Sequence, residues 1–269
     1  EDMTDPTAEA GVSVELTCNS PTASLNGAGS DLGPNFIYQW DGPGNIFGDD
    51  SLTPTVTQTG TFTLTVTNVL NGCSSADDVE VLEDMNTPQI AIAPPADLDC
   101  QVLELTLDAT QSSQGTDFIF QWTGPGIVSG NNTLSPLINQ PGTYQLEITN
   151  NANGCVETGE VIVGQELQPP TADAGVDFTR NCWDDSQPLD GSASSQGNNI
   201  SYEWTTSDGT IVNGITSVAP VISSGGIYTL IVTDDDNGCT SSDKVEVFED
   251  APEAEVALNQ PFCFGDDGA

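Results

Sequence analysis

The sequence predicts an all-β protein made of three tandem β-sandwiches followed by the beginning of a fourth. The first observation is a repeat along the chain, marked by three tryptophans at equal intervals: Trp40, Trp122 and Trp204. The second is the alternation of apolar and polar residues around these tryptophans, which is typical of half-buried strands. No stretch has a convincing helical period. A fixed repeat of this kind indicates a modular protein in which one small domain is stacked.

Cysteines define the boundaries of the repeats. One series keeps the interval of the tryptophans: Cys18, Cys100 and Cys182. A second series follows with almost the same interval: Cys73, Cys155 and Cys239. Cys263 comes almost one interval after Cys182 and opens another copy. We therefore divide the chain into repeat 1 (residues 1–86), repeat 2 (87–168), repeat 3 (169–250) and the start of repeat 4 (251–269), and expect it to be a segment of a longer array.

Each repeat should contain a central strand and a late hairpin. The central strand carries the tryptophan, as in "FIYQWDGPG", "FIFQWTGPG" and "ISYEWTTSDG". The late strand, for example "GTFTLTVTNVLNGC", ends in an Asn-Gly pair at Asn71, Asn153 or Asn237. These residues tolerate positive φ, so the chain should fold straight back into a last strand. Along the first late strand, alternate residues should point into the core: Phe62, Leu64 and Val66. They should face Trp40 and either Ile37 or Tyr38 on the central strand. The equivalent inward residues of repeats 2 and 3 are Tyr144, Leu146, Ile148, Tyr228, Leu230 and Val232.

About seven short strands per repeat predict an immunoglobulin-like sandwich. An ordinary immunoglobulin domain joins its two sheets by a cysteine pair. Leucine occupies both places here, in two series: Leu25, Leu107 and Leu189, and Leu64, Leu146 and Leu230. The contact across the core is therefore expected to be apolar, and the cysteines must have another role.

The segments "LDGSAS", "YEW" and "TDDDNGC" of repeat 3 carry a family resemblance. With the rest of that repeat they resemble the polycystic-kidney-disease-type (PKD) immunoglobulin-like repeats of giant surface proteins of Bacteroidota, including gliding-type adhesins. The resemblance extends over all three repeats. It implies a PKD-like sandwich fold and an extracellular stalk or adhesin segment at the cell surface.

The charge of the chain restricts its partners. There are 41 acidic residues, two basic residues, Arg180 and Lys244, and no histidine, so the net charge is −39. A chain this acidic repels nucleic acid and anionic membranes. No apolar run reaches the roughly 18 residues of a membrane span. Partners are instead expected among cations, neighbouring repeats, other copies in a fibre or bundle, and surface glycans.

An enzyme is not expected. Adjacent carboxylates are frequent, but in a chain this acidic they arise by composition and mostly form a solvated surface. A serine or cysteine nucleophile needs a base, and the chain has no histidine and a single lysine.

Calcium is the cofactor that the acidic turns could hold, because it binds six to eight carboxylate, amide and backbone oxygens. Acidic residues cluster at the junctions between repeats and in nearby turns, each junction followed by a proline that should stiffen it. The candidate ligands are Glu83, Asp84, Asp97, Asp99, Asp184, Asp185, Asp234, Asp236, Glu249 and Asp250. The alternative is that these acids keep the surface soluble and cap turns, since no ligand set with diagnostic spacing occurs.

Two surface features suggest glycans. Asp50-Ser51-Leu52 matches the acceptor pattern of Bacteroidota O-glycosylation that the resemblance implies, with Ser51 as the modified residue, although an ordinary turn serine is the alternative. Exposed aromatic residues could also bind sugars, and the candidates are Trp183, Phe47 and Phe178. The sequence thus favours a structural segment of an extracellular fibre, stalk or adhesin, with a carbohydrate-binding module array and a pilin-like subunit as alternatives.

The strand directions predict where the cysteines pair. Cys18 precedes the core residue Leu25 and Cys73 follows the core residue Leu64, which places them at opposite poles of one sandwich. A disulfide requires Cα atoms within about 7 Å. We therefore expect disulfides between repeats, Cys18 with Cys155 and Cys100 with Cys239, which would reinforce each junction. In the same scheme Cys73 pairs with a preceding repeat, and Cys182 and Cys263 pair with following ones; the alternative is a bond within each repeat.

Overall fold

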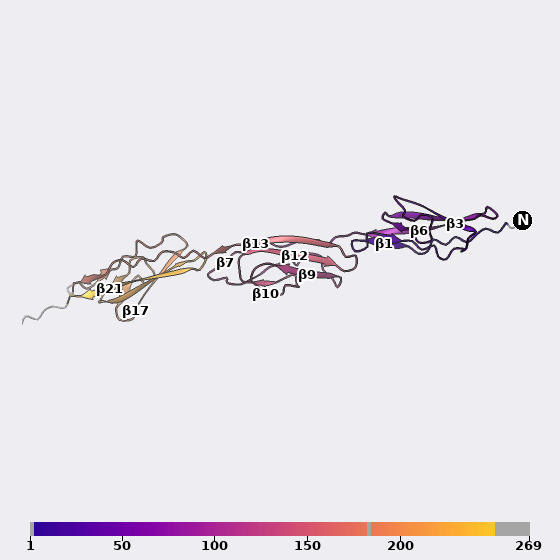
Figure 1. The fold of residues 1–269 in the computed structure, drawn as a ribbon. Helices are drawn as coiled ribbons and strands as arrows, with labels where there is room; N and C mark the ends of the chain where they lie inside the picture. Colours follow the sequence, from indigo (N-terminus) through magenta and orange to yellow (C-terminus); the bar gives the residue numbers. More distant parts are fainter. Residues whose placement is uncertain (1–2, 182–183, 251–269) are drawn as a thin grey trace, which may run out of the picture. The chain divides into compact units, whose positions relative to one another are not determined.

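The computed structural model describes residues 3–181 and 184–250, and within these ranges every element of regular secondary structure is a strand (Figure 1). The described residues form two compact units. Residues 3–97 and 104–164 make up the first, and residues 98–103, 165–181 and 184–250 the second. The predicted all-β class is therefore confirmed. Repeat 4 lies outside the described residues, and the boundaries between repeats stay a prediction.

Repeat 1 is a two-layered sandwich in the first unit. Its larger sheet has the order β1-β6-β5-β3, formed by β1 (Val14–Thr17), β6 (Ser74–Asp84), β5 (Gly60–Asn68) and β3 (Phe36–Asp41). The other layer contains β2 (Ala23–Ser24) and β4 (Thr55–Val56). β1 runs parallel to β6, whereas β5 is antiparallel to both of its neighbours.

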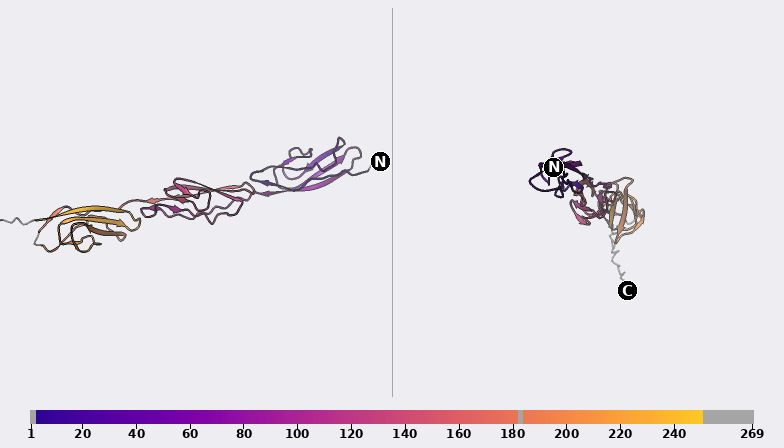
Figure 2. Two further views of the ribbon diagram at one scale, coloured as in Figure 1. Left: turned by 90° about the horizontal axis from the view of Figure 1, so that it is seen from below. Right: turned by 90° about the vertical axis from the view of Figure 1, so that its right-hand side faces the viewer.

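The first unit also holds most of repeat 2, again in two layers that can be followed in Figures 1 and 2. One sheet has the order β13-β12-β9: β13 (Val156–Val163), β12 (Gly142–Asn150) and β9 (Phe118–Thr123). The other has the order β10-β11-β8: β10 (Ile127–Ser129), β11 (Leu137–Ile138) and β8 (Leu105–Thr106).

The second unit contains repeat 3 and one short parallel pair. That pair joins β7 (Leu98–Asp99) to β14 (Gln165–Glu166). The larger sheet has the order β15-β21-β20-β17: β15 (Phe178–Arg180), β21 (Thr240–Glu249), β20 (Gly226–Asp234) and β17 (Ile200–Thr206). The third sheet has the order β16-β19-β18: β16 (Gln187–Pro188), β19 (Val221–Ile222) and β18 (Ile211–Asn213).

The predicted inward residues form the cores. All nine inward residues of the late strands are fully buried: Phe62, Leu64, Val66, Tyr144, Leu146, Ile148, Tyr228, Leu230 and Val232. The three leucines of the opposite layer are buried with them: Leu25, Leu107 and Leu189. On the central strand of repeat 1, Tyr38 packs against the core and Ile37 is exposed. The sheets are therefore joined by apolar contacts, as the leucines predict.

Each of the three periodic tryptophans is buried, and its ring nitrogen is hydrogen-bonded to the loop that covers it. Trp40 Nε1 donates to the carbonyl of Ser51 at 2.9 Å, Trp122 Nε1 to that of Thr133 at 2.9 Å, and Trp204 Nε1 to that of Ser217 at 3.0 Å. A buried indole N–H needs such a partner. The periodic tryptophan thus fixes the same loop in all three repeats.

Candidate functional site: the two disulfide linkages

The structure pairs Cys18 with Cys155 and Cys100 with Cys239, the pairs that the strand directions predict. The Cα atoms are 5.0 Å apart in both bonds, within the range that a disulfide needs. We call the Cys18–Cys155 bond and its surroundings the first linkage, which lies in the first unit. The Cys100–Cys239 bond and its surroundings are the second linkage, in the second unit.

The parallel register of β1 and β6 explains why Cys18 does not pair within repeat 1. Thr17 is the register partner of Asp84, so Cys18 lies where β6 ends. Cys73 directly precedes β6, which is 11 residues long. At about 3.3 Å per residue the two cysteines are separated by roughly 35 Å along the strand. The staggered pairing is therefore a direct result of strand direction.

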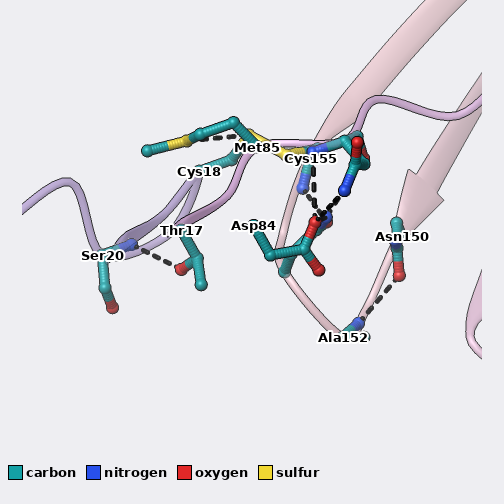
Figure 3. The surroundings of a disulfide bond; sticks show 10 residues. Thr17, Cys18, Ser20, Asp84, Met85, Asn150, Ala152 and Cys155 are labelled. Carbon is teal, nitrogen blue, oxygen red and sulfur yellow. Dashed lines mark hydrogen bonds between the residues drawn. A yellow bond between two sulfur atoms is a disulfide. The ribbon is translucent and has the colours of Figure 1, made fainter. Parts of the chain in front are cut away.

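The first linkage joins a turn of repeat 1 to the late hairpin of repeat 2. The backbone N–H of Asn19 donates to the carbonyl of Asn153 at 3.2 Å. The side chain of Asn19 also fills the space beside Gly154, because a Cβ on that glycine would lie 1.9 Å from Asn19 Cγ. Cys155 is fully buried, and Met85 lies against the disulfide, with its Sδ 3.9 Å from Cys18 Sγ (Figure 3).

A buried asparagine organises the first linkage. Asn153 is 1% exposed, and its Nδ2 donates to Asp84 Oδ1 and to the carbonyl of Asn86, both at 3.0 Å. Its Oδ1 accepts the backbone N–H of Cys155 at 2.9 Å. One amide side chain therefore connects the end of repeat 1 to the cysteine of the hairpin. The sequence marks this residue only as part of a turn, although its recurrence before each second cysteine was a usable signal.

The Asp84 carboxylate accepts several hydrogen bonds at this point (Figure 3). Besides the Asn153 amide, the backbone N–H and the side-chain amide of Asn86 donate to Asp84 Oδ1, at 3.2 and 2.8 Å. These donors, Asn153 first, hold the pKa of Asp84 below its ordinary value of 3.8 because they stabilise the ionised form. Asp84 is thus a charged acceptor for the linker and the hairpin.

The second linkage repeats this arrangement with different side chains. The backbone N–H of Cys100 donates to the carbonyl of Asn237 at 3.0 Å. Asn237 is 5% exposed; its Nδ2 donates to the carbonyl of Gln168 at 3.1 Å, and its Oδ1 accepts the N–H of Cys239 at 2.9 Å. Gln101 fills the space beside Gly238, 2.0 Å from where a Cβ would lie. Where Asn153 donates to the Asp84 carboxylate, Asn237 donates to the uncharged backbone carbonyl of Gln168.

The candidate calcium ligands are distributed over turns and strand ends. Several accept hydrogen bonds from nearby backbone: Asp97 from Gly164, Asp99 from Gln101 and Val102, and Asp234 from Asp236. The other candidates are Glu83 at the end of β6, Asp184 and Asp185 before β16, Asp236 in the last hairpin, and Glu249 and Asp250 at the end of β21. Within residues 3–181 and 184–250, no three His, Cys, Asp or Glu side chains are grouped so that they could hold a metal ion. Calcium therefore stays a prediction.

Glu249 is held by two donors at the end of repeat 3. Its Oε1 accepts the backbone N–H of Gly225 at 2.7 Å and Nη1 of the buried Arg180 at 3.1 Å. These contacts, the Gly225 bond first, lower the pKa of Glu249. Arg180 of repeat 3 occupies the register position that Leu16 occupies in repeat 1. Repeat 3 therefore has the Arg180–Glu249 ion pair where repeat 1 has the apolar side chain of Leu16.

The remaining predicted residues are placed as follows. Ser51 is half-buried, and its Oγ donates to the carbonyl of Gly48 at 2.7 Å. Glycosylation of Ser51 stays a prediction. Phe47 is 62% exposed and Phe178 packs against the core of repeat 3. Cys73 follows Asn71 in the first hairpin, and its pairing with a preceding repeat is untested. Trp183, Cys182 and Cys263 lie outside the described residues.

The chain is similar in fold to known proteins built from tandem immunoglobulin-like domains. The titin I-band fragment I67-I69 is 12% identical, with 93% of this chain and 100% of that chain covered and a TM-score of 0.44. The N-terminal eight Ig domains of Down Syndrome Cell Adhesion Molecule are 13% identical, covering 92% and 37%, with a TM-score of 0.41. The PKD domain from the KIAA 1837 protein is 32% identical over 33% of this chain and 96% of that chain, with a TM-score of 0.26. No family model and no curated protein matches the chain.

Proposed function

We propose that this chain is a non-catalytic structural segment of an extracellular stalk, fibre or adhesin, in which disulfides lock successive immunoglobulin-like repeats together. The observation that carries this proposal is the staggered pairing of Cys18 with Cys155 and Cys100 with Cys239. Disulfides form and persist in oxidising, extracellular compartments, which supports the location. In the part of the chain that the structure describes, no helix is long and apolar enough to cross a membrane.

The two disulfides interlace. One closes a loop with a sequence separation of 137 residues and the other a loop of 139 residues, and the loops overlap between Cys100 and Cys155. The shortest covalent path from one end of the chain to the other reaches Cys18, crosses to Cys155, runs backwards to Cys100 and crosses to Cys239. Residues 19–99 and 156–238 are outside this path. Both linkers between the repeats are among them.

Interlacing limits how far the chain can be pulled out. About 100 residues remain on the covalent path, which corresponds to about 350 Å of fully extended chain, against about 920 Å for the whole chain without disulfides. Tension therefore cannot extend the linkers, even if a repeat unfolds. This property suits a segment whose task is to transmit force or to keep a fixed spacing.

Single-molecule force spectroscopy of the whole chain, held by its two ends, tests this function. We expect a maximum extension of about 350 Å in the oxidised protein, rising to about 920 Å after reduction. Removing one linkage by the double substitution Cys18→Ser and Cys155→Ser should give about 450 Å, and removing the other by Cys100→Ser and Cys239→Ser a similar value. An oxidised chain that extends to its full length would refute the proposal.

Carbohydrate binding is a second candidate, favoured by the surroundings of Phe47. This exposed ring lies on an open cavity of about 450 Å³ in repeat 1 that is also lined by Gln39, Asp41 and Asn45. An exposed ring beside carboxylate and amide groups can stack on a sugar and bind its hydroxyls. A glycan array probed with the intact chain and with the variant Phe47→Ala distinguishes the two functions. Glycan binding that is lost in the variant would establish this candidate, and no binding would leave the mechanical function alone.

A further inference from the structure

Three of the five Asn-Gly pairs in the chain, at Asn71, Asn153 and Asn237, occupy equivalent hairpins that differ in how they are covered. The glycines all have positive φ: 77° at Gly72, 72° at Gly154 and 66° at Gly238. Gly154 and Gly238 are covered by Asn19 and Gln101, whereas apart from the adjoining residues no described atom lies within 4 Å of a Cβ placed on Gly72. The chain therefore contains one open and two covered copies of the same turn.

Asparagine followed by glycine can modify itself. The backbone nitrogen of the glycine attacks the side-chain carbon Cγ of the asparagine, a bond from nitrogen to Cγ forms, and the bond from Cγ to the side-chain nitrogen breaks. The glycine nitrogen gives up its proton, the side-chain NH2 group takes up one proton and leaves as ammonia, and a cyclic imide remains. Water then opens the imide to aspartate or isoaspartate. Glycine allows the attack because it has no Cβ to obstruct it and is free in φ.

In the closed hairpin this reaction is hindered. The nitrogen that must attack is a hydrogen-bond donor in every copy: Gly72 N donates to Asn68 at 2.8 Å, Gly154 N to Asn150 at 2.7 Å and Gly238 N to Asp234 at 2.7 Å. Reaction therefore requires local opening of the turn. The cost of opening should differ, because Asn71 is half-buried and donates to the carbonyl of Thr4, whereas Asn153 and Asn237 are buried within linkages.

We propose that the Asn-Gly pairs of the three late hairpins are sites of self-deamidation whose reactivity is set by the linkages. In this chain Asn71 reacts in the folded state, while Asn153 and Asn237 react only after their own linkage has opened. The extent of deamidation at Asn153 or Asn237 then shows whether the linkage around that residue has been open.

In the first linkage the product also prevents closing. A carboxylate at position 153 would face Asp84 Oδ1, which is now 3.0 Å from the Asn153 amide nitrogen. Two carboxylates at this distance repel each other, and the donor to the carbonyl of Asn86 is lost. Once a thiol reductant has opened the Cys18–Cys155 bond, deamidation of Asn153 therefore disfavours its re-closing. At Asn237 the partner is the uncharged carbonyl of Gln168, so the effect is weaker.

Peptide mass spectrometry after incubation in mildly alkaline buffer tests the proposal. In the oxidised chain we expect Asn71 to deamidate at least about tenfold faster than Asn153 and Asn237. Reduction and alkylation should bring all three to similar rates. Equal rates at the three sites in the oxidised chain, or a slower rate at Asn71, would overturn the proposal.

Selective opening supplies a control within one molecule. The double substitution Cys18→Ser and Cys155→Ser should accelerate deamidation of Asn153 and leave Asn237 unchanged, and Cys100→Ser with Cys239→Ser should do the reverse. An unchanged deamidation rate at the linkage that keeps its disulfide shows that the chain is still folded there. Acceleration of both sites in a chain whose second disulfide is intact would contradict control by the individual linkage.

Discussion

Asn153 Nδ2 lies 3.0 Å from Asp84 Oδ1, so a neutral amide of repeat 2 donates to a charged carboxylate at the end of the last strand of repeat 1. The two residues are 69 positions apart in the sequence. A hydrogen bond to a charged acceptor is stronger than one between neutral groups. The first linkage is therefore held by a polar contact as well as by its disulfide.

Replacing Asn153 should weaken the first linkage specifically. In Asn153→Ala the N–H of Cys155 loses its acceptor in a buried position, and we expect a loss of about 1–3 kcal/mol in the free energy of unfolding. Urea denaturation of the oxidised chain measures it. Asn71→Ala, in the open hairpin, is the matched control and should cost less. An equal loss in both variants would mean that burial of the linkage does not contribute.

Acid should weaken the first linkage before the second. Because the pKa of Asp84 is lowered in the folded chain, its contribution is complete above the ordinary value of 3.8 and is lost as the pH falls through the folded pKa. The side-chain amide resonances of Asn153 should therefore shift in an NMR titration with a midpoint below that value. Those of Asn237, which donates to the Gln168 carbonyl, should not follow. A midpoint at or above the ordinary value, or parallel shifts of both residues, would argue against this contact.

Peptide mapping under non-reducing conditions should recover the staggered bonds. We expect a Cys18 peptide linked to a Cys155 peptide and a Cys100 peptide linked to a Cys239 peptide, because β1 and β6 run parallel and place Cys18 far from Cys73. A Cys18 peptide linked to Cys73 would refute the stagger. The same map shows whether Cys182 and Cys263 pair with other repeats.

Calcium, if it bridges the acidic junctions, should act in addition to the disulfides. Removing a bridging cation leaves like charges facing each other, an effect that is greatest at low ionic strength. We expect a chelator to increase the maximum dimension in X-ray scattering, but by less than reduction does, because the covalent bonds remain. An unchanged profile at low salt would exclude the bridging cation, and a larger effect than that of reduction would assign the junctions mainly to calcium.

The sequence by itself determined the repeat, the strand pattern and the core. Spacing of Trp40, Trp122 and Trp204 and the alternation around Leu64 are local and periodic properties, and burial of apolar side chains turns them directly into sheets. Strand direction even predicted the disulfide partners, since it depends only on the order of the strands. The strand pattern and the core could be read without coordinates because each depends on neighbours within one repeat.

Only the tertiary structure decided what surrounds the disulfides. The role of Asn153 depends on Asp84 and Asn86, which belong to another repeat, and no spacing within one copy predicts that contact. The same holds for the acidic residues. Composition makes them calcium candidates, whereas the structure shows Asp99 and Asp234 accepting hydrogen bonds from their own turns and Asp97 accepting one from the distant Gly164. Hydrogen-bond partners are set by where separate segments meet in space, and that is fixed only when the repeats are packed together.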